Sequence, residues 1–429
     1  MGHYARLAHN RDFTLLWTGG ALREMGSSMA AFALPLIAFA VSGSALQAGW
    51  VAAMEMVGFV LLVLPAGVVV DRVNRRTVLL GTSLLGLAAY GSVLAAALLA
   101  DLTTTHLAVV ALLTGCGEAF GRPAEMATIR RLVDREDLPA AISQNVARSS
   151  VAELGGGPLS GLALGLTRWA PFAATVVGYA AATLCTLAIR TSLAAPAREG
   201  DPTTMRRDLV QGLRFVGRSP FRRAFFLYAA LSNLVVAAVF LLVALRMLDA
   251  GWSPFVIGLT ETASGLAGLA GATVAPHVID RVGTGWIAIG SAFAMALAVA
   301  PLIWTAHPLA VALLLGTGVA AQPVMIAGVS SYLLTTTPEQ MQGRISTATH
   351  FVTHATVPLG PLLAGVLVTA IGFERTTAVL VGLLLLCAVY VLGRGVVRDV
   401  GTPDTWPTEP EPVPEWSARG RHRADAGRD

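Results

Sequence analysis

Charged side chains inside long apolar runs are the residues of this sequence that are best placed to do chemistry. A charge at the centre of a membrane-spanning helix costs about 2.5 to 3.5 kcal/mol on insertion scales, so such a residue needs a partner or water. It therefore marks a possible route for protons, ions or polar groups. The residues with this placement are Arg23, Glu24, Glu55, Glu118, Arg122, Arg148, Glu153 and Glu261.

Glu55 is the acid that the spacing singles out. It has no charged neighbour within one helical turn, and an unpaired carboxylate of this kind suits a reversible proton carrier. The alternative is a structural pair with a neighbouring hydroxyl or with Arg23, since both charges lie at a similar depth, roughly 15 to 20 Å from the same helix ends. Glu118 and Arg122 are four residues apart and can pair on one helix face. For that pair, a structural salt bridge and a role in binding substrate or protons are both open.

Glu261 is a second candidate proton carrier, flanked by Thr260 and Thr262. His350 and His354 lie four residues apart on one face, and we interpret them as cavity or packing residues because no third metal ligand is in view. All three cysteines lie in apolar runs, where they behave as small hydrophobic residues. We therefore expect no metal site, no disulfide and no cofactor.

The composition excludes a set of soluble domains. The chain has 429 residues, of which 55% are hydrophobic and 13% charged, with a mean hydropathy of +0.66. A globular surface needs roughly twice that share of charge. Twelve helices of about 20 to 25 residues fit both the length and the charge deficit. The predicted fold is an all-α polytopic membrane protein with twelve transmembrane helices.

Apolar runs between charged, proline or glycine breaks place the helices. The predicted spans are 13–41, 45–70, 76–100, 106–126, 139–166 and 170–192, then 224–248, 254–278, 285–304, 308–334, 344–370 and 376–397.

The helices divide into two halves around an arginine-rich stretch. We predict an N-terminal six-helix half over 1–193, a cytoplasmic linker over 194–223, a C-terminal half over 224–398 and a disordered cytoplasmic tail over 399–429. Motifs repeat between the halves at offsets of 209 and 203 residues, which indicates a duplicated six-helix unit with pseudo-symmetry.

Positive charge gives the orientation. With both termini inside, 24 of the 30 arginines are cytoplasmic and only Arg168 and Arg375 are external. Cytoplasmic loops carry the excess of positive charge, so we predict a multi-pass protein of the cell membrane with both ends in the cytoplasm.

The segment from Gly67 to Arg76, which includes Asp71, Arg72 and Arg75, resembles the signature loop of the Major Facilitator Superfamily. It lies between the second and third predicted spans, where that family carries the loop. The resemblance covers nearly the whole chain except the tail.

Two further motifs support this resemblance. Asp280 and Arg281 repeat the loop in the second half. Gly157, Pro158 and Gly161 resemble the Gly-Pro-x-x-Gly motif of the family's drug and proton antiporters. The opening Asn10-Arg11-Asp12-Phe13 and the stretch Arg122-Pro123-Ala124 are similar to the exporter branch that includes macrolide and siderophore efflux proteins.

The resemblance implies a conformational role for both motifs. Asp71 would lie near Gly343 and Arg344, where a helix start favours a carboxylate, and this contact would act as a latch. The alternative is a plain turn that only fixes topology. Gly157 and Pro158 would suit a moving seam between halves, and ordinary small-residue packing is the alternative.

We therefore predict a secondary active transporter, not an enzyme. The chain has no lysine, so it cannot contain a Walker-type phosphate loop. By resemblance it would export a hydrophobic or amphiphilic small molecule, such as a drug or secreted metabolite, by proton antiport with alternating access. Its partners would be that substrate, protons and the lipid bilayer, not nucleic acid, and it would act as a monomer. The alternatives are a siderophore exporter, uptake instead of efflux, and a non-transporting sensor or scaffold on the same fold.

Overall fold

The computed structural model describes residues 3–99, 101–194 and 203–407. Every regular element in these ranges is a helix. The helices of the first part are α1 His3–His9, α2 Arg11–Ser42, α3 Ala45–Arg72, α4 Arg75–Leu98, α5 Thr104–Leu132, α6 Leu138–Leu166 and α7 Ala170–Ala188. Those of the second part are α8 Thr203–Arg218, α9 Pro220–Asp249, α10 Pro254–Ile279, α11 Thr284–Val299, η1 Ala300–Ile303, α12 Pro308–Thr336, α13 Glu339–His354, α14 Leu359–Leu392, α15 Gly395–Arg398 and η2 Pro403–Thr405.

The twelve-span prediction is confirmed. Nine segments of the described residues are long and apolar enough to cross a membrane. One of them, Phe351–Leu392, contains two crossings that meet at Gly372, where φ is 80° and ψ is 171°. α5 and α6 are not among the nine because polar and charged residues lower their hydropathy, but each has 29 residues and packs within the bundle. Eight single crossings, the double one and these two helices make twelve.

Short polar side chains fix where several helices begin. Asn10, Ser44, Asn74, Thr103 and Ser253 each accept a hydrogen bond from a backbone N–H two or three residues further on. Such caps satisfy donors that the first helical turn leaves free. The capped helix starts lie at both ends of the molecule, where short turns join consecutive spans that run antiparallel.

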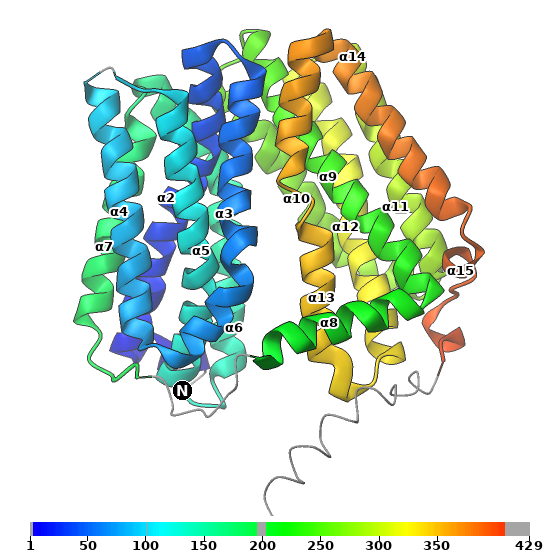
Figure 1. The fold of residues 1–429 in the computed structure, drawn as a ribbon, viewed down its shortest axis with the longest axis horizontal. Helices are drawn as coiled ribbons and strands as arrows, with labels where there is room; N and C mark the ends of the chain where they lie inside the picture. The colour runs from blue at the N-terminus through cyan, green and yellow to red at the C-terminus, as the bar shows by residue number, and fades with distance from the viewer. Residues whose placement is uncertain (1–2, 100, 195–202, 408–429) are drawn as a thin grey trace, which may run out of the picture.

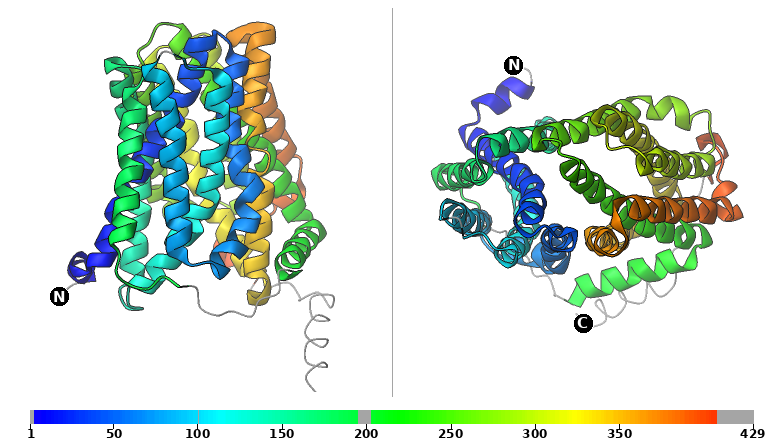
Figure 2. Two further views of the ribbon diagram at one scale, coloured as in Figure 1. Left: turned by 60° about the vertical axis from the view of Figure 1, so that its left-hand side comes forward. Right: turned by 90° about the horizontal axis from the view of Figure 1, so that it is seen from above.

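The spans form two bundles that repeat the same packing (Figures 1 and 2). In the first, α5 packs on both α3 and α4; in the second, α12 packs on both α10 and α11. Counted along the chain, these helices are the second, third and fourth spans of each half, so the same spans pack together in both halves. The predicted pseudo-symmetry of two six-helix halves is confirmed by this equivalence.

The two halves contact each other mainly near the upper end in Figure 1, opposite the N-terminus. Gly49, in the second turn of α3, faces the Pro361 carbonyl of α14, and Gly365 faces the Ala45 carbonyl. Glycine is needed here because a Cβ at either position would meet the backbone of the other helix. A second seam joins α6 to α10 at the same level. Towards the lower end the ribbons of the two halves diverge (Figure 1).

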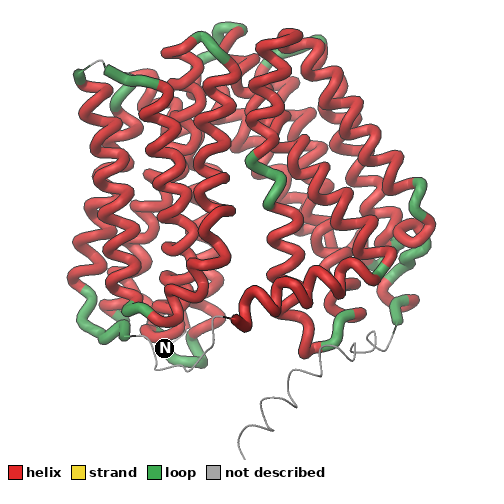
Figure 3. The backbone as a smooth tube through the Cα atoms, in the orientation of Figure 1, coloured by secondary structure: helices red, strands yellow, loops and turns green. Residues whose placement is uncertain are grey.

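The eleventh span departs from the prediction of one helix over 344–370. It is interrupted at residues 355–358, between α13 and α14, and Figure 3 shows the break as a loop inside the helical column. Pro358 explains the break, because proline lacks the N–H that a continuing helix requires and disfavours helical geometry in the residue before it.

The predicted linker and tail both contain helical structure. α8 crosses the lower end of the second half and packs against α13 and α9 (Figure 1). Residues 399–407, predicted to be part of the disordered tail, instead pack on α11: Gly401 and Val400 accept backbone hydrogen bonds of 3.0 and 2.9 Å from Thr284 and Gly285. The rest of the predicted tail, 408–429, and linker residues 195–202 lie outside the described residues.

Candidate functional site

The charged residues of the first half form a chain of alternating sign across α2, α5 and α6. At its centre is the carboxylate of Glu125, which is 6% exposed. Its Oε2 lies 3.3 Å from a terminal guanidinium nitrogen of Arg23, and its Oε1 lies 2.6 Å from one of Arg148. Arg23 also pairs with Glu118. One acid thus joins the buried Arg148 of α6 and the half-buried Arg23 of α2.

Each end of the chain has its own partners. At one end, Arg148 Nε donates to Glu24 at 3.0 Å, and the Ser149 hydroxyl donates to the same carboxylate at 2.7 Å. At the other, Arg122 Nε lies 3.6 Å from Glu118, which is too long for a hydrogen bond. The chain therefore runs Glu24, Arg148, Glu125, Arg23, Glu118, Arg122 and contains equal numbers of acids and bases.

Arg122 is held loosely because Glu118 is mainly engaged by Arg23. Its side chain is 67% exposed although it lies far from either end of α5, and its guanidinium lies 5.7 Å from the Phe59 ring centroid. An exposed guanidinium at this depth requires water or a polar ligand nearby. The predicted Glu118–Arg122 contact thus exists, but as the weak end of a longer network.

Glu125 is the site residue that the sequence analysis missed. It falls at the margin of the predicted span 106–126, where a charge looks like the start of a loop. Its spacing could have revealed it, because Glu118, Arg122 and Glu125 follow the i, i+4, i+7 pattern of one helix face. α5 in fact continues to Leu132, which places Glu125 inside the bundle.

Three acids at membrane depth lie outside this chain. Glu55 on α3 and Glu261 on α10 are half-buried, and Glu153 on α6 is exposed. Among the described residues, none of the three carboxylates has an ion-pair or hydrogen-bond partner. The predicted alternative of a pair between Glu55 and Arg23 is wrong, because Arg23 is occupied by Glu118 and Glu125.

The antiporter-like motif lies on the seam between α6 and α10. Gly161 packs directly on the backbone of Phe255, and a Cβ at Gly157 would lie 3.2 Å from the Gly258 Cα and 3.4 Å from a carboxylate oxygen of Glu261. Pro158 follows Gly157 inside the helix. The motif therefore provides a close backbone contact between the two halves, and one of the unpaired acids lies beside it.

The signature loop is tied to its own half. The guanidinium of Arg76 donates to the carbonyl of Ile189, and the backbone N–H of Arg75 donates to Leu193 at 3.1 Å. Asp71 and Arg72 are exposed at the end of α3, and so are Asp280 and Arg281 at the end of α10. The predicted partners of Asp71, Gly343 and Arg344, are outside the described side chains, as is His350.

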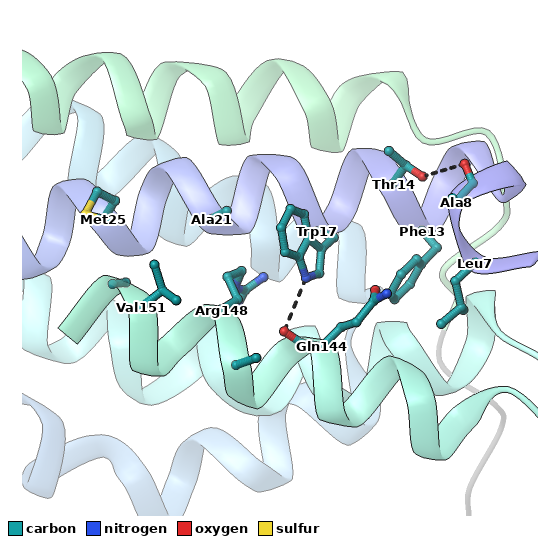
Figure 4. A pocket seen from close by; sticks show the side chains of 12 residues that line it. Leu7, Ala8, Phe13, Thr14, Trp17, Ala21, Met25, Gln144, Arg148 and Val151 are labelled. Carbon is teal, nitrogen blue, oxygen red and sulfur yellow. Dashed lines mark hydrogen bonds between the residues drawn. The ribbon is translucent and has the colours of Figure 1, made fainter. Parts of the chain in front are cut away.

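A lateral groove of about 470 Å³ lies between α1, α2 and α6 (Figure 4). Its walls are mostly apolar and include Phe13, Trp17, Met25 and Val151, and the Trp17 indole donates to the Gln144 carbonyl at 3.4 Å. Arg148 lies in the groove lining. Because Arg148 is also a member of the charge chain, the groove and the chain share this residue.

Comparisons with known proteins agree with this architecture. The family model of the Major Facilitator Superfamily matches residues 16–354 and, in a second match, 247–424. The chain is 27% identical over 402 residues to the multidrug efflux pump Tap of Mycolicibacterium fortuitum, covering 87% of this chain and 93% of that protein.

Solved structures share the fold at low identity. The nucleoside transporter NupG aligns with a TM-score of 0.70 at 14% identity, covering 88% of this chain and 98% of that one. A bacterial homologue of the lysosomal transporter Spinster, in an inward-facing and unoccupied conformation, gives 0.69 at 15% identity, with 91% and 98% covered. A bacterial homologue of ferroportin in an inward-facing state gives 0.66 at 17%, with 90% and 98% covered. Together with the two six-helix halves, the family match shows that the chain belongs to the Major Facilitator Superfamily.

Proposed function

We propose that this chain exports a hydrophobic or amphiphilic small molecule in exchange for protons. The observation that carries the proposal is the Glu55 carboxylate, which lies at membrane depth on α3 and has no partner among the described residues. An acid that neither pairs nor hydrogen-bonds can gain and lose a proton without breaking a structural contact. The related multidrug efflux pump supports export as the direction.

The amphiphilic character of the substrate is supported by the groove between α2 and α6. A molecule dissolved in the bilayer meets mainly apolar side chains there and then Arg148, which also belongs to the buried charge chain. The substrate would thus enter from the lipid and reach polar groups without first crossing to water.

Alternating access is the proposed mode of movement, with the lower end in Figure 1 as the cytoplasmic one and with a single chain as the working unit. The halves meet near the upper end and diverge below, as expected for an inward-facing state. Both seams are built from glycine contacts, which can separate without breaking ion pairs. Rocking of one half against the other would close the lower end and open the upper one.

The test uses purified protein in sealed liposomes with a panel of fluorescent amphiphiles and an imposed proton gradient. Glu55→Gln keeps the size of the side chain but removes its exchangeable charge. We expect this variant to lose proton-driven transport and to retain exchange of labelled for unlabelled substrate. Glu136→Gln, at an exposed position in the loop between α5 and α6, serves as the control and should behave like the parent.

Two outcomes would contradict the proposal. Unchanged proton-driven transport by Glu55→Gln would remove Glu55 from the coupling role. No gradient-dependent movement of any substrate by the parent would favour a sensor or scaffold on the same fold.

A further inference from the structure

The α6–α10 seam contains a hydrogen bond that crosses between the two halves. The hydroxyl of Thr262 on α10 lies 2.6 Å from the carbonyl of Leu154 on α6, closer than the 3.1 Å to the Gly258 carbonyl in its own helix. A short O–H to carbonyl distance indicates that the hydroxyl donates across the seam. The two halves are therefore joined here by a specific polar contact as well as by glycine packing.

Pro158 explains why this carbonyl is free to accept. In a regular helix the carbonyl of Leu154 would accept from the N–H of residue 158, but proline has no N–H. An unsatisfied carbonyl in a closed seam is costly, and Thr262 supplies the missing donor. Thr262 of the second half thus replaces the hydrogen bond that Pro158 removes from the first half.

Glu261 is the residue next to Thr262, and its carboxylate lies where Gly157 leaves room. A side chain at residue 157 would occupy the space beside that carboxylate. Glycine at this position therefore both permits the close helix contact and makes the notch that holds the acid.

No cation faces Glu261 from the elements packed around it, as far as the structure describes them. α12 has no charged residue. The facing side of α6 carries Glu153, one turn before Gly157, which has the same sign. The charged residues of α9 lie near its ends, and the guanidinium of Arg246 is bound to the Leu302 and Ile303 carbonyls. A charged carboxylate in this half-buried notch has no cation to compensate it, which favours the neutral carboxyl.

We propose that Glu261 is a proton-binding site that operates this seam, so that the protonated acid holds α6 and α10 together and its deprotonation releases them. The inference rests on the proposed function and adds a second acid with a different task from Glu55. A proton taken from the upper side would close the seam, and its release at the lower side would allow the substrate-loaded protein to open upwards. This order is the one that proton-coupled export requires.

The test measures the seam directly and needs no substrate. Spin labels at Leu166→Cys, the last residue of α6, and at Trp304→Cys, directly after η1, report the distance across the upper end after the three native cysteines are replaced; the native side chains are 80% and 79% exposed. In the parent, lowering the pH from 8 to 5 should shift the distances towards the short, closed population.

Glu261→Gln, which mimics the neutral acid, should stay in the closed population at both pH values, while the control Glu136→Gln, at its exposed loop position, should keep the parent response. Thr262→Val has nearly the same volume without the hydroxyl, and it should show a larger open population at pH 5 than the parent. A Glu261→Gln protein that keeps the full pH response would overturn the inference. So would a parent whose distances do not change with pH.

Failure of the proposed function leaves a different signature. If the parent moves no substrate in liposomes but its seam closes at low pH in a Glu261-dependent way, the export proposal fails and the proton-operated seam stands. If transport is gradient-driven but closure of the seam does not depend on Glu261, the inference about Glu261 fails and the export proposal stands.

Discussion

The two halves share a helix arrangement but differ in how they hold charge. The first half contains six charged residues in one alternating chain, from Glu24 to Arg122. The second half has one acid at membrane depth, Glu261, and this carboxylate has no ion-pair partner among the described residues. The two halves thus differ in how much of their charge is paired: the first joins six charges in one network and leaves Glu55 and Glu153 unpaired, whereas the second has only the unpaired Glu261 at this depth, beside the seam.

The largest expected effect comes from breaking the chain at its centre. Arg23→Leu would leave Glu118 and Glu125 short of a cation in a poorly hydrated place, at a cost of about 3 to 5 kcal/mol of folding stability. The same change at Arg122, which is 67% exposed, should cost about 1 kcal/mol or less. Thermal and denaturant unfolding in detergent would measure both. Equal losses for the two variants would show that the chain is not a cooperative network.

A second prediction tests whether closure of the α6–α10 seam depends on a glycine at residue 161. Gly161→Ala places a Cβ against the Phe255 backbone, whereas Gly165→Ala, one turn later in the same helix, meets no atom within 4 Å. Overpacking of this kind costs about 1 to 3 kcal/mol, which corresponds to a shift of roughly 5- to 150-fold in the equilibrium between open and closed seams. Label distances across the upper end should lengthen for Gly161→Ala only. If both variants match the parent, the glycine contact is not needed for closure.

The smallest effect concerns the two loop copies. If Asp71 acts as a latch at a helix start, Asp71→Asn should favour opening of the lower end by about 0.3 to 1 kcal/mol, roughly two- to fivefold in population. Asp280→Asn should have less effect, because its loop has lost the glycine of the motif to Pro276. Labelling rates of cysteines introduced near Gly343 measure the opening. Rates that equal the parent's for both variants would leave the loops as topology signals only.

Helix number, charge depth and pairing within one helix could be predicted from the sequence, but pairing between helices could not. Glu118 and Arg122 are local neighbours, so their contact followed from spacing. The partners of Arg23 lie 95 and 102 residues away, and only the relative tilt of α2 and α5 decides that they meet. The break at 355–358 was within reach, because Pro358 marks it, and the polar residues of α13 before it contrast with the apolar run after it.

The sequence by itself determined that the chain is a twelve-span helical membrane protein with a duplicated half. In a bilayer every backbone group must be hydrogen-bonded within the protein, and a continuous apolar run of about 20 residues meets this requirement by forming a helix. Tertiary structure decided which charges pair, which acids stay alone and which carbonyl Thr262 reaches. These contacts change when one helix shifts or tilts by a few ångströms against another. No local rule in the sequence encodes such shifts.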